Sequence, residues 1–173
     1  MNGTTSEEEL SGLRGLLARE AIRDRLYVWA RGVDRHDREL QESVFFPDSI
    51  DNHGVFNGPA AEFINWLHAH PFDWKMTHHM IGNVIIVMQS PTQAEVESYF
   101  IAHHAKPDPS PEPPLVLLGR YFDRFELRDG SWRVAHRQVI VDWQSPTGED
   151  YGFLTGHRSG EDITSQAGFG KPA

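Results

Sequence analysis

The chain has 173 residues, and 25 acidic against 16 basic side chains give it a net charge of −9 at neutral pH. This length suits one domain with its own core, and the acidic balance argues against nonspecific binding to nucleic acid or anionic membranes. The chain contains no cysteine, which excludes disulfides, thiolate nucleophiles and cysteine-ligated metal sites.

The first residues and the longest apolar run indicate whether to expect a signal peptide or a membrane span. Residues 1–9 show no basic start followed by an apolar stretch, so we expect no signal peptide. The longest aliphatic run, residues 84–88, is far too short to cross a bilayer. We therefore expect a cytoplasmic protein that does not bind membranes.

The first third of the chain has helical patterns. Ser6 followed by three glutamates is typical of a helix start, because a hydroxyl caps the first turn and carboxylates favour the positive end of the dipole. Apolar residues at three- and four-residue spacing predict a long helix that ends between residues 34 and 37. A short helix is expected over 38–46, a turn beside a short strand at 51–54, and a third helix from Gly58-Pro59 to just before Pro71.

The second half has the patterns of a β-sheet. Four strands are predicted over 78–89, 93–105, 114–127 and 131–143. Ser90-Pro91 and Asp129-Gly130 favour tight antiparallel hairpins, whereas the proline-rich stretch 106–114 is expected to be an exposed connection. We predict an α+β domain over 1–146, with helices packed on a curved sheet, and a glycine-rich tail over 147–173 that is loose or ordered only against a partner.

The sequence lacks the motifs of several common catalytic and cofactor-binding sites. The ten histidines include two adjacent pairs, but there is no HExxH motif, so no metal site is expected. The absence of a GxSxG elbow disfavours serine hydrolysis, and the absence of GxGxxG and P-loop motifs disfavours a nucleotide cofactor.

The remaining polar residues in apolar segments favour acid–base chemistry. A carboxylate such as Asp34 can hold one nitrogen of His79 and leave the other as a general base. Arg137 or Tyr121 can then stabilise a developing anion. The alternative is structural: Asp34 as an exposed helix-end residue, Arg137 in a surface ion pair and Tyr121 in the core.

Three segments in residues 18–143 carry a family resemblance. They are YVWARGVD at 27–34, THHMIGN at 77–83, and the run from Gly119-Arg120-Tyr121 through Asp129-Gly130-Ser131-Trp132 to His136-Arg137 and Asp142-Trp143. In this order they resemble the SnoaL-like branch of the nuclear transport factor 2-like superfamily. That resemblance implies a cone-shaped, cystatin-like α+β barrel with a mainly antiparallel sheet.

The resemblance also implies an activity. In the dehydratases and dehydrochlorinases of this branch, an aspartate at the end of the first helix orients a histidine base, and Asp34 and His79 match these positions. Arg137 matches a pocket arginine and Tyr121 a pocket aromatic residue, whereas Trp29 stands where two of these enzymes have Lys or Tyr. We expect a cofactor-free lyase or isomerase acting on a small hydrophobic cyclic or aromatic substrate.

Further expectations concern the binding residues and partners. Tyr27, Trp29 and either His104 or His103 are expected to contact the substrate. A carbon–carbon lyase using the same base, and a non-catalytic binding or subunit module, remain alternatives. A second apolar face of the strand 78–89, formed by His78, Met80, Val84, Ile86 and Met88, predicts a homo-oligomer, a dimer or trimer.

Overall fold

The computed structural model describes residues 6–70, 74–108, 113–146, 151–159, 161–166 and 169. Its elements in chain order are α1 (Glu7–Asp34), α2 (Arg38–Val44), β1 (Phe45–His53), β2 (Phe56–Pro59), α3 (Ala60–Ala69), β3 (Met76–Ser90), β4 (Gln93–Ala105), β5 (Leu115–Arg128), β6 (Ser131–Gln144), β7 (Leu154–Thr155) and a 3-10 turn, Ile163–Gln166.

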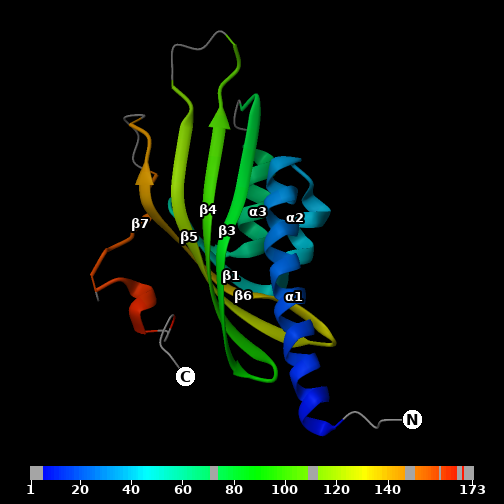
Figure 1. Ribbon diagram of the computed structural model, residues 1–173. Helices are drawn as coiled ribbons and strands as arrows, with labels where there is room; N and C mark the ends of the chain where they lie inside the picture. Colours follow the sequence, from blue (N-terminus) through cyan, green and yellow to red (C-terminus); the bar gives the residue numbers. More distant parts are fainter. Residues whose placement is uncertain are drawn as a thin grey trace.

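One curved sheet organises the molecule. Its strand order is β2-β1-β6-β5-β4-β3, and β7 pairs with β6 beyond the end of β1. All neighbours are antiparallel except the parallel pairs β1–β6 and β6–β7. The three helices lie together on one side of the long strands (Figure 1). The predicted α+β architecture of helices on a mainly antiparallel sheet is confirmed.

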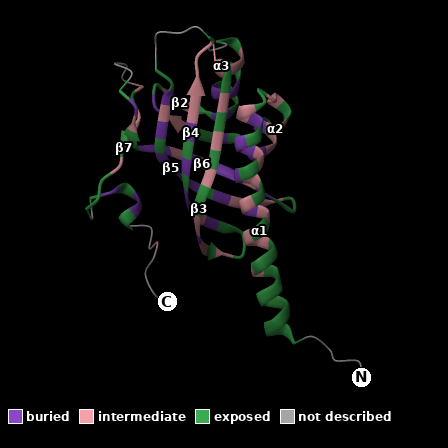
Figure 2. Ribbon diagram, turned by 45° about the horizontal axis from the view of Figure 1, so that its top comes forward, coloured by how far each residue is buried: buried purple, intermediate pink, exposed green. Residues whose placement is uncertain are grey.

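Local signals account for the boundaries of α1 and of the hairpins. Ser6 caps α1, as predicted, and it also forms a capping box with Glu9. The first turns of α1 are exposed, and the helix is buried only from Ile22 onward (Figure 2). At the β5–β6 hairpin, Asp129 and Gly130 have φ values of 50° and 75°, the left-handed pair that a tight two-residue turn requires.

The prediction for residues 45–54 was wrong in the extent of the strand. Helix α2 stops at Val44, and the nine-residue strand β1 runs on to His53, where a helix end at 46 and a turn beside a short strand at 51–54 were expected. The reason is a long-range pairing: β1 runs parallel to β6, with Asp51 opposite Arg137. Because the partner strand is more than 80 residues away, the local sequence does not reveal it.

The predicted apolar outer face of β3 was also wrong. The pairing of β3 with β4 is irregular between Ile81 and Val84, which shifts the alternation of side chains. His78 and Met80 therefore face outward, whereas Ile86 is buried in the core.

Residues 151–159 and 161–166 pack on the domain, contrary to the loose tail predicted for 147–173. Leu154 pairs with Ile140 of β6, and Asp162 bonds to Arg120 of β5 through two oxygens. A Cβ at Gly54, whose φ is +70°, would collide with the carbonyl oxygen of Tyr151. Residues 147–150, 160, 167–168 and 170–173 of the predicted tail, and 109–112 of the predicted connection, lie outside the described residues.

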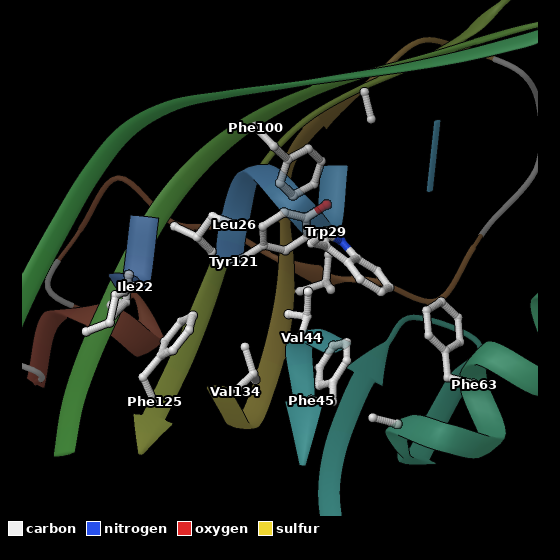
Figure 3. Close-up of a cluster of buried hydrophobic side chains, with 14 of the residues drawn as sticks. Ile22, Leu26, Trp29, Val44, Phe45, Phe63, Phe100, Tyr121, Phe125 and Val134 are labelled. Carbon is white, nitrogen blue, oxygen red and sulfur yellow. The ribbon is translucent and has the colours of Figure 1, made fainter. Parts of the chain in front are cut away.

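The core fills the space between the helices and the sheet. Figure 3 shows side chains from both layers meeting there: Ile22, Leu26 and Trp29 of α1 face Phe100, Tyr121, Phe125 and Val134 of the long strands. Trp29 meets Phe45 edge to face at 5.3 Å between ring centroids. This packing fixes the end of α1 against the sheet, and with it the residues that follow.

Candidate active site

A cavity of about 370 Å³ lies between the end of α1, the helix α3 and the inner face of the sheet. Its walls are mostly aromatic and aliphatic, a composition typical of small-molecule sites. The polar side chains among the lining residues are Asp34, His36, Gln41, His53, Lys75, Thr77, His79, His104, Tyr121 and Tyr151.

Asp34 and His79 are joined by two hydrogen bonds. Asp34 is the last residue of α1, and His79 lies near the start of β3. The backbone N–H of His79 donates to Oδ2 of Asp34 at 2.9 Å, and ring Nδ1 lies 2.7 Å from Oδ1. Both side chains are largely buried, at 11% and 8% exposure. One carboxylate thus fixes both the backbone and the ring of one histidine.

The charge of Asp34 determines the tautomer of His79. Burial raises the pKa of Asp34, but the hydrogen bonds from His79 outweigh it and leave the pKa below its ordinary value. Since an ionised carboxylate only accepts hydrogen bonds, Nδ1 of His79 carries a proton. The other ring nitrogen, Nε2, is then the basic one, and His79 lines the cavity.

His104, rather than His103, lines the cavity. Its ring meets the ring of His79 edge to face at 5.5 Å and lies 5.3 Å from Trp74. Burial, together with electrostatic repulsion between the two rings, lowers the pKa of His104 to about 4. At neutral pH it is therefore an uncharged imidazole beside His79.

Tyr121 and Trp29 form one wall of the cavity. Tyr121 stacks on Phe100 at 4.5 Å, and its hydroxyl points toward the indole nitrogen of Trp29 (Figure 3). Burial raises the pKa of Tyr121 to about 12, so the phenol keeps its proton and can donate it in a hydrogen bond. Trp29, predicted as a substrate contact, also lines the cavity.

Arg137 lies behind the wall, which corrects its predicted place in the pocket. Its side chain is completely buried and forms two hydrogen bonds to Asp123, at 2.8 and 2.7 Å. The guanidinium packs 4.2 Å from the ring centre of Tyr121, and Arg137 is not among the residues that line the cavity. Burial lowers the pKa of Arg137, but the charge of Asp123 outweighs this and holds it above the ordinary value, so Arg137 stays charged.

Tyr27 also lies outside the cavity. It is half exposed on the outer side of α1, where it borders a separate depression together with Arg31 and His78. The periodicity of the helix explains the position of Tyr27, because residues two apart, such as Tyr27 and Trp29, point to different sides of a helix.

Two histidines that line the cavity, His53 and His36, were missed in the sequence. His53 lies 3.3 Å from Asp51, and the available signal was an Asp-x-His pattern, whose two residues share one face of a strand. His36 follows α1 with a φ of 50° and packs against His68 at 3.9 Å. Nothing in the local pattern distinguished His36 from an ordinary helix-end residue.

A family model for the SnoaL-like domain matches residues 14–138. The chain belongs to the SnoaL-like domain family. No curated protein matches the chain. The SnoaL-like assignment covers all of β1 to β5 and most of β6, and therefore includes Asp34, His79 and Tyr121.

Solved structures share the SnoaL-like fold at low sequence identity. A putative scytalone dehydratase from Novosphingobium aromaticivorans is 21% identical with a TM-score of 0.75, over 84% of this chain and 98% of that one. Hexachlorocyclohexane dehydrochlorinase LinA-type3 from Novosphingobium barchaimii is 18% identical with a TM-score of 0.69, over 78% and 93%. The β subunit of a putative aromatic-ring-hydroxylating dioxygenase from N. aromaticivorans is 20% identical with a TM-score of 0.63, over 75% and 92%.

Among the described residues, no group of three histidine or acidic side chains is arranged to hold a metal ion. None of the helices in the described part of the chain combines the length and apolar character needed to span a membrane.

Proposed function

We propose that this SnoaL-like protein is a cofactor-independent lyase that removes a proton from an activated carbon of a small hydrophobic cyclic substrate and eliminates a neighbouring group. The observation that carries the proposal is the pair Asp34–His79, with a carboxylate on Nδ1 and a basic Nε2 in an apolar cavity. General bases of this kind need no metal or organic cofactor to take a proton from carbon.

The surrounding residues favour the same reaction. The uncharged ring of His104 adds no positive charge beside His79, so it does not repel the imidazolium that forms. Tyr121 keeps its proton and can donate to an oxygen on which negative charge develops. The apolar walls exclude water, which strengthens both interactions.

In the proposed step, His79 is the base and the leaving group departs from the neighbouring carbon. Nε2 of His79 takes a proton from the substrate carbon, and the electron pair of that C–H bond forms the new C=C bond. The bond to the leaving group on the next carbon breaks with its own pair, and Asp34 stabilises the imidazolium. The same proton abstraction followed by return of the proton to another carbon would be an isomerisation, so both reactions depend on His79.

Elimination can be tested with substrates taken from the structural relatives. Purified protein would be incubated with scytalone, with related 3-hydroxy cyclic ketones and with hexachlorocyclohexane, and the unsaturated products followed by absorbance and mass spectrometry. We expect His79→Gln to lower the rate by roughly two to four orders of magnitude. The matched control is His78→Gln, because His78 is the neighbouring histidine and faces outward.

The result separates the lyase from a binding module. A dioxygenase β subunit shares the fold, so the fold alone does not require catalysis. If ligands of this class bind but neither elimination nor exchange of their acidic C–H for deuterium occurs, the protein is a binding module and the proposal is wrong.

A further inference from the structure

The cavity contains a second imidazole–carboxylate pair. His53 lies at the end of β1 and lines the cavity, and its Nδ1 is 3.3 Å from Oδ1 of Asp51. The two residues are two apart on one strand and so share a face. The Asp51 side chain is fully buried, whereas the ring of His53 keeps 21% exposure. The pair resembles Asp34 and His79 in having a carboxylate at Nδ1 of a ring that lines the cavity, but here the carboxylate is fully buried behind the ring.

The ring of His53 is held in place. It stacks on Phe63 of α3 at 4.3 Å with an angle of 23° between the rings, and its edge faces Phe153 at 6.0 Å. A ring that is fixed on one side by Phe63 and on one nitrogen by Asp51 presents its remaining nitrogen, Nε2, in a defined direction.

Behind His53, Asp51 belongs to a buried cluster of charged side chains. Asp51 lies opposite Arg137 in the β1–β6 pairing, and Arg137 is bonded to Asp123. All three side chains are at 0% exposure, so one guanidinium lies among two buried acidic side chains. Within the described residues, Oδ2 of Asp51 and Nη1 of Arg137 have no hydrogen-bond partner. The other oxygen of Asp51, Oδ1, is therefore the one that holds the ring of His53.

The two pairs approach the cavity from different walls. In the sheet, β1 and β3 are separated by β6, β5 and β4. The curvature of the sheet nevertheless brings His53 of β1 and His79 of β3 to the same cavity. A ligand in this space can therefore meet a base on one side and a proton donor on the other.

We propose that His53, oriented by Asp51, is the general acid of the elimination and protonates an oxygen leaving group. This rests on the proposed lyase function and narrows its substrate class to hydroxylated or alkoxylated cyclic carbonyl compounds, since a departing chloride needs no proton. As Nε2 of His79 takes the carbon-bound proton, the C–O bond breaks with its electron pair, and the proton on Nε2 of His53 joins that oxygen. Water or an alcohol leaves; solvent then deprotonates His79 and reprotonates His53.

The test uses leaving groups that differ in their need for a proton. The probes are 3-aryloxycyclohexanones with 4-nitrophenol or 4-methylphenol as the leaving group. 4-Nitrophenolate departs as a stable anion, whereas 4-methylphenol must be protonated. We expect His53→Gln to lower the rate with the 4-methylphenyl ether by roughly 10²–10⁴-fold and to leave the 4-nitrophenyl ether nearly unchanged. Asp51→Asn should show the same selective loss. The control is His70→Gln, because His70 is an exposed histidine, and this variant should lose activity with neither ether.

The outcomes distinguish the two proposals. His79→Gln should lose both substrates, because both reactions need the base. If His53→Gln reacts with both ethers at the wild-type rate while His79→Gln reacts with neither, the general-acid role is overturned and the lyase function stands. If the wild type eliminates from neither ether, both proposals fail. An equal loss on both ethers in His53→Gln, with unchanged thermal unfolding, also contradicts the acid role, because it indicates a loss of binding.

Discussion

Asp34 holds His79 at two points, with one carboxylate oxygen on the backbone N–H and the other on ring Nδ1. The end of α1 and the start of β3 are thereby joined by a single side chain. Groups connected in this way act together, so their effects on a reaction are not expected to add.

The first prediction is non-additivity in the Asp34–His79 pair. His79→Ala removes the base and should lower kcat by roughly two to four orders of magnitude. Asp34→Asn keeps the shape but offers an amide to the ring, so the tautomer and the imidazolium are both less favoured. The double variant should then be hardly slower than His79→Ala in steady-state kinetics. If Asp34→Asn alone abolished turnover while His79→Ala retained it, Asp34 would be the base.

A second prediction concerns His104 and the pH dependence of stability. Its pKa is about 4 in the folded protein against an ordinary value of 6.5. Between these values the unfolded chain binds a proton that the folded protein does not, so stability falls as pH decreases from 6.5 to 4. We expect wild type to lose about 2 kcal/mol more than His104→Gln over this window. Urea unfolding of both proteins at several pH values measures the difference; parallel curves would contradict it.

Third, we expect Arg137 to stabilise the fold rather than to take part directly in the reaction. Arg137→Met leaves two buried carboxylates without their cation and should lower the free energy of unfolding by about 3–5 kcal/mol. The control is Arg124→Met, because Arg124 is an exposed arginine of the neighbouring strand and should cost less than about 1 kcal/mol. Denaturant unfolding provides the measurement. A stable Arg137→Met protein with specifically reduced turnover would instead return Arg137 to a direct role.

Fourth, we expect Gly54 to determine how closely residues 151–159 pack against the cavity. Gly54→Ala adds a Cβ that collides with Tyr151, so Tyr151 and Phe153 should move away from the cavity. Gly130→Ala is the matched control, because Gly130 also has a positive φ but open space around it. Both variants should lose about 1 kcal/mol of stability from the left-handed backbone, but only Gly54→Ala should weaken binding of a cavity ligand. Equal binding by the two variants, measured by isothermal titration calorimetry, would contradict this.

The fifth prediction is a homo-oligomer formed through the outer face of the sheet. Met80, Ile101, Leu118 and Trp143 are paired across four neighbouring strands, and all four are exposed. A row of this kind is apolar and contiguous, which is typical of an interface. Light scattering should give a dimer or trimer, and Ile101→Glu should shift it toward the monomer. Leu16→Glu, on the exposed start of α1, is the control for added charge; a monomeric wild type would overturn the prediction.

Much of the secondary structure could be predicted from short-range signals. The capping box at Ser6 and the turn at Asp129-Gly130 act within a few residues, so the sequence identifies them directly. The positions of Asp34 and His79 also follow from the sequence, through the resemblance of their surrounding segments to one family. The sequence thus determined the α+β class, the four long strands and the two residues at the centre of the proposed site.

The tertiary structure decided what depends on distant partners. The parallel pairing of β1 with β6 extended a predicted short strand over a predicted helix end and turn, and it brought Asp51 beside Arg137. It also buried Arg137 behind Tyr121 and placed His53 at the cavity, neither of which a local pattern encodes. The pairing of Arg120 with Asp162 likewise ordered a segment that looked loose because it contains few large apolar residues. Such contacts stabilise a conformation only when the whole sheet has formed, and this is the physical reason that short-range signals miss them.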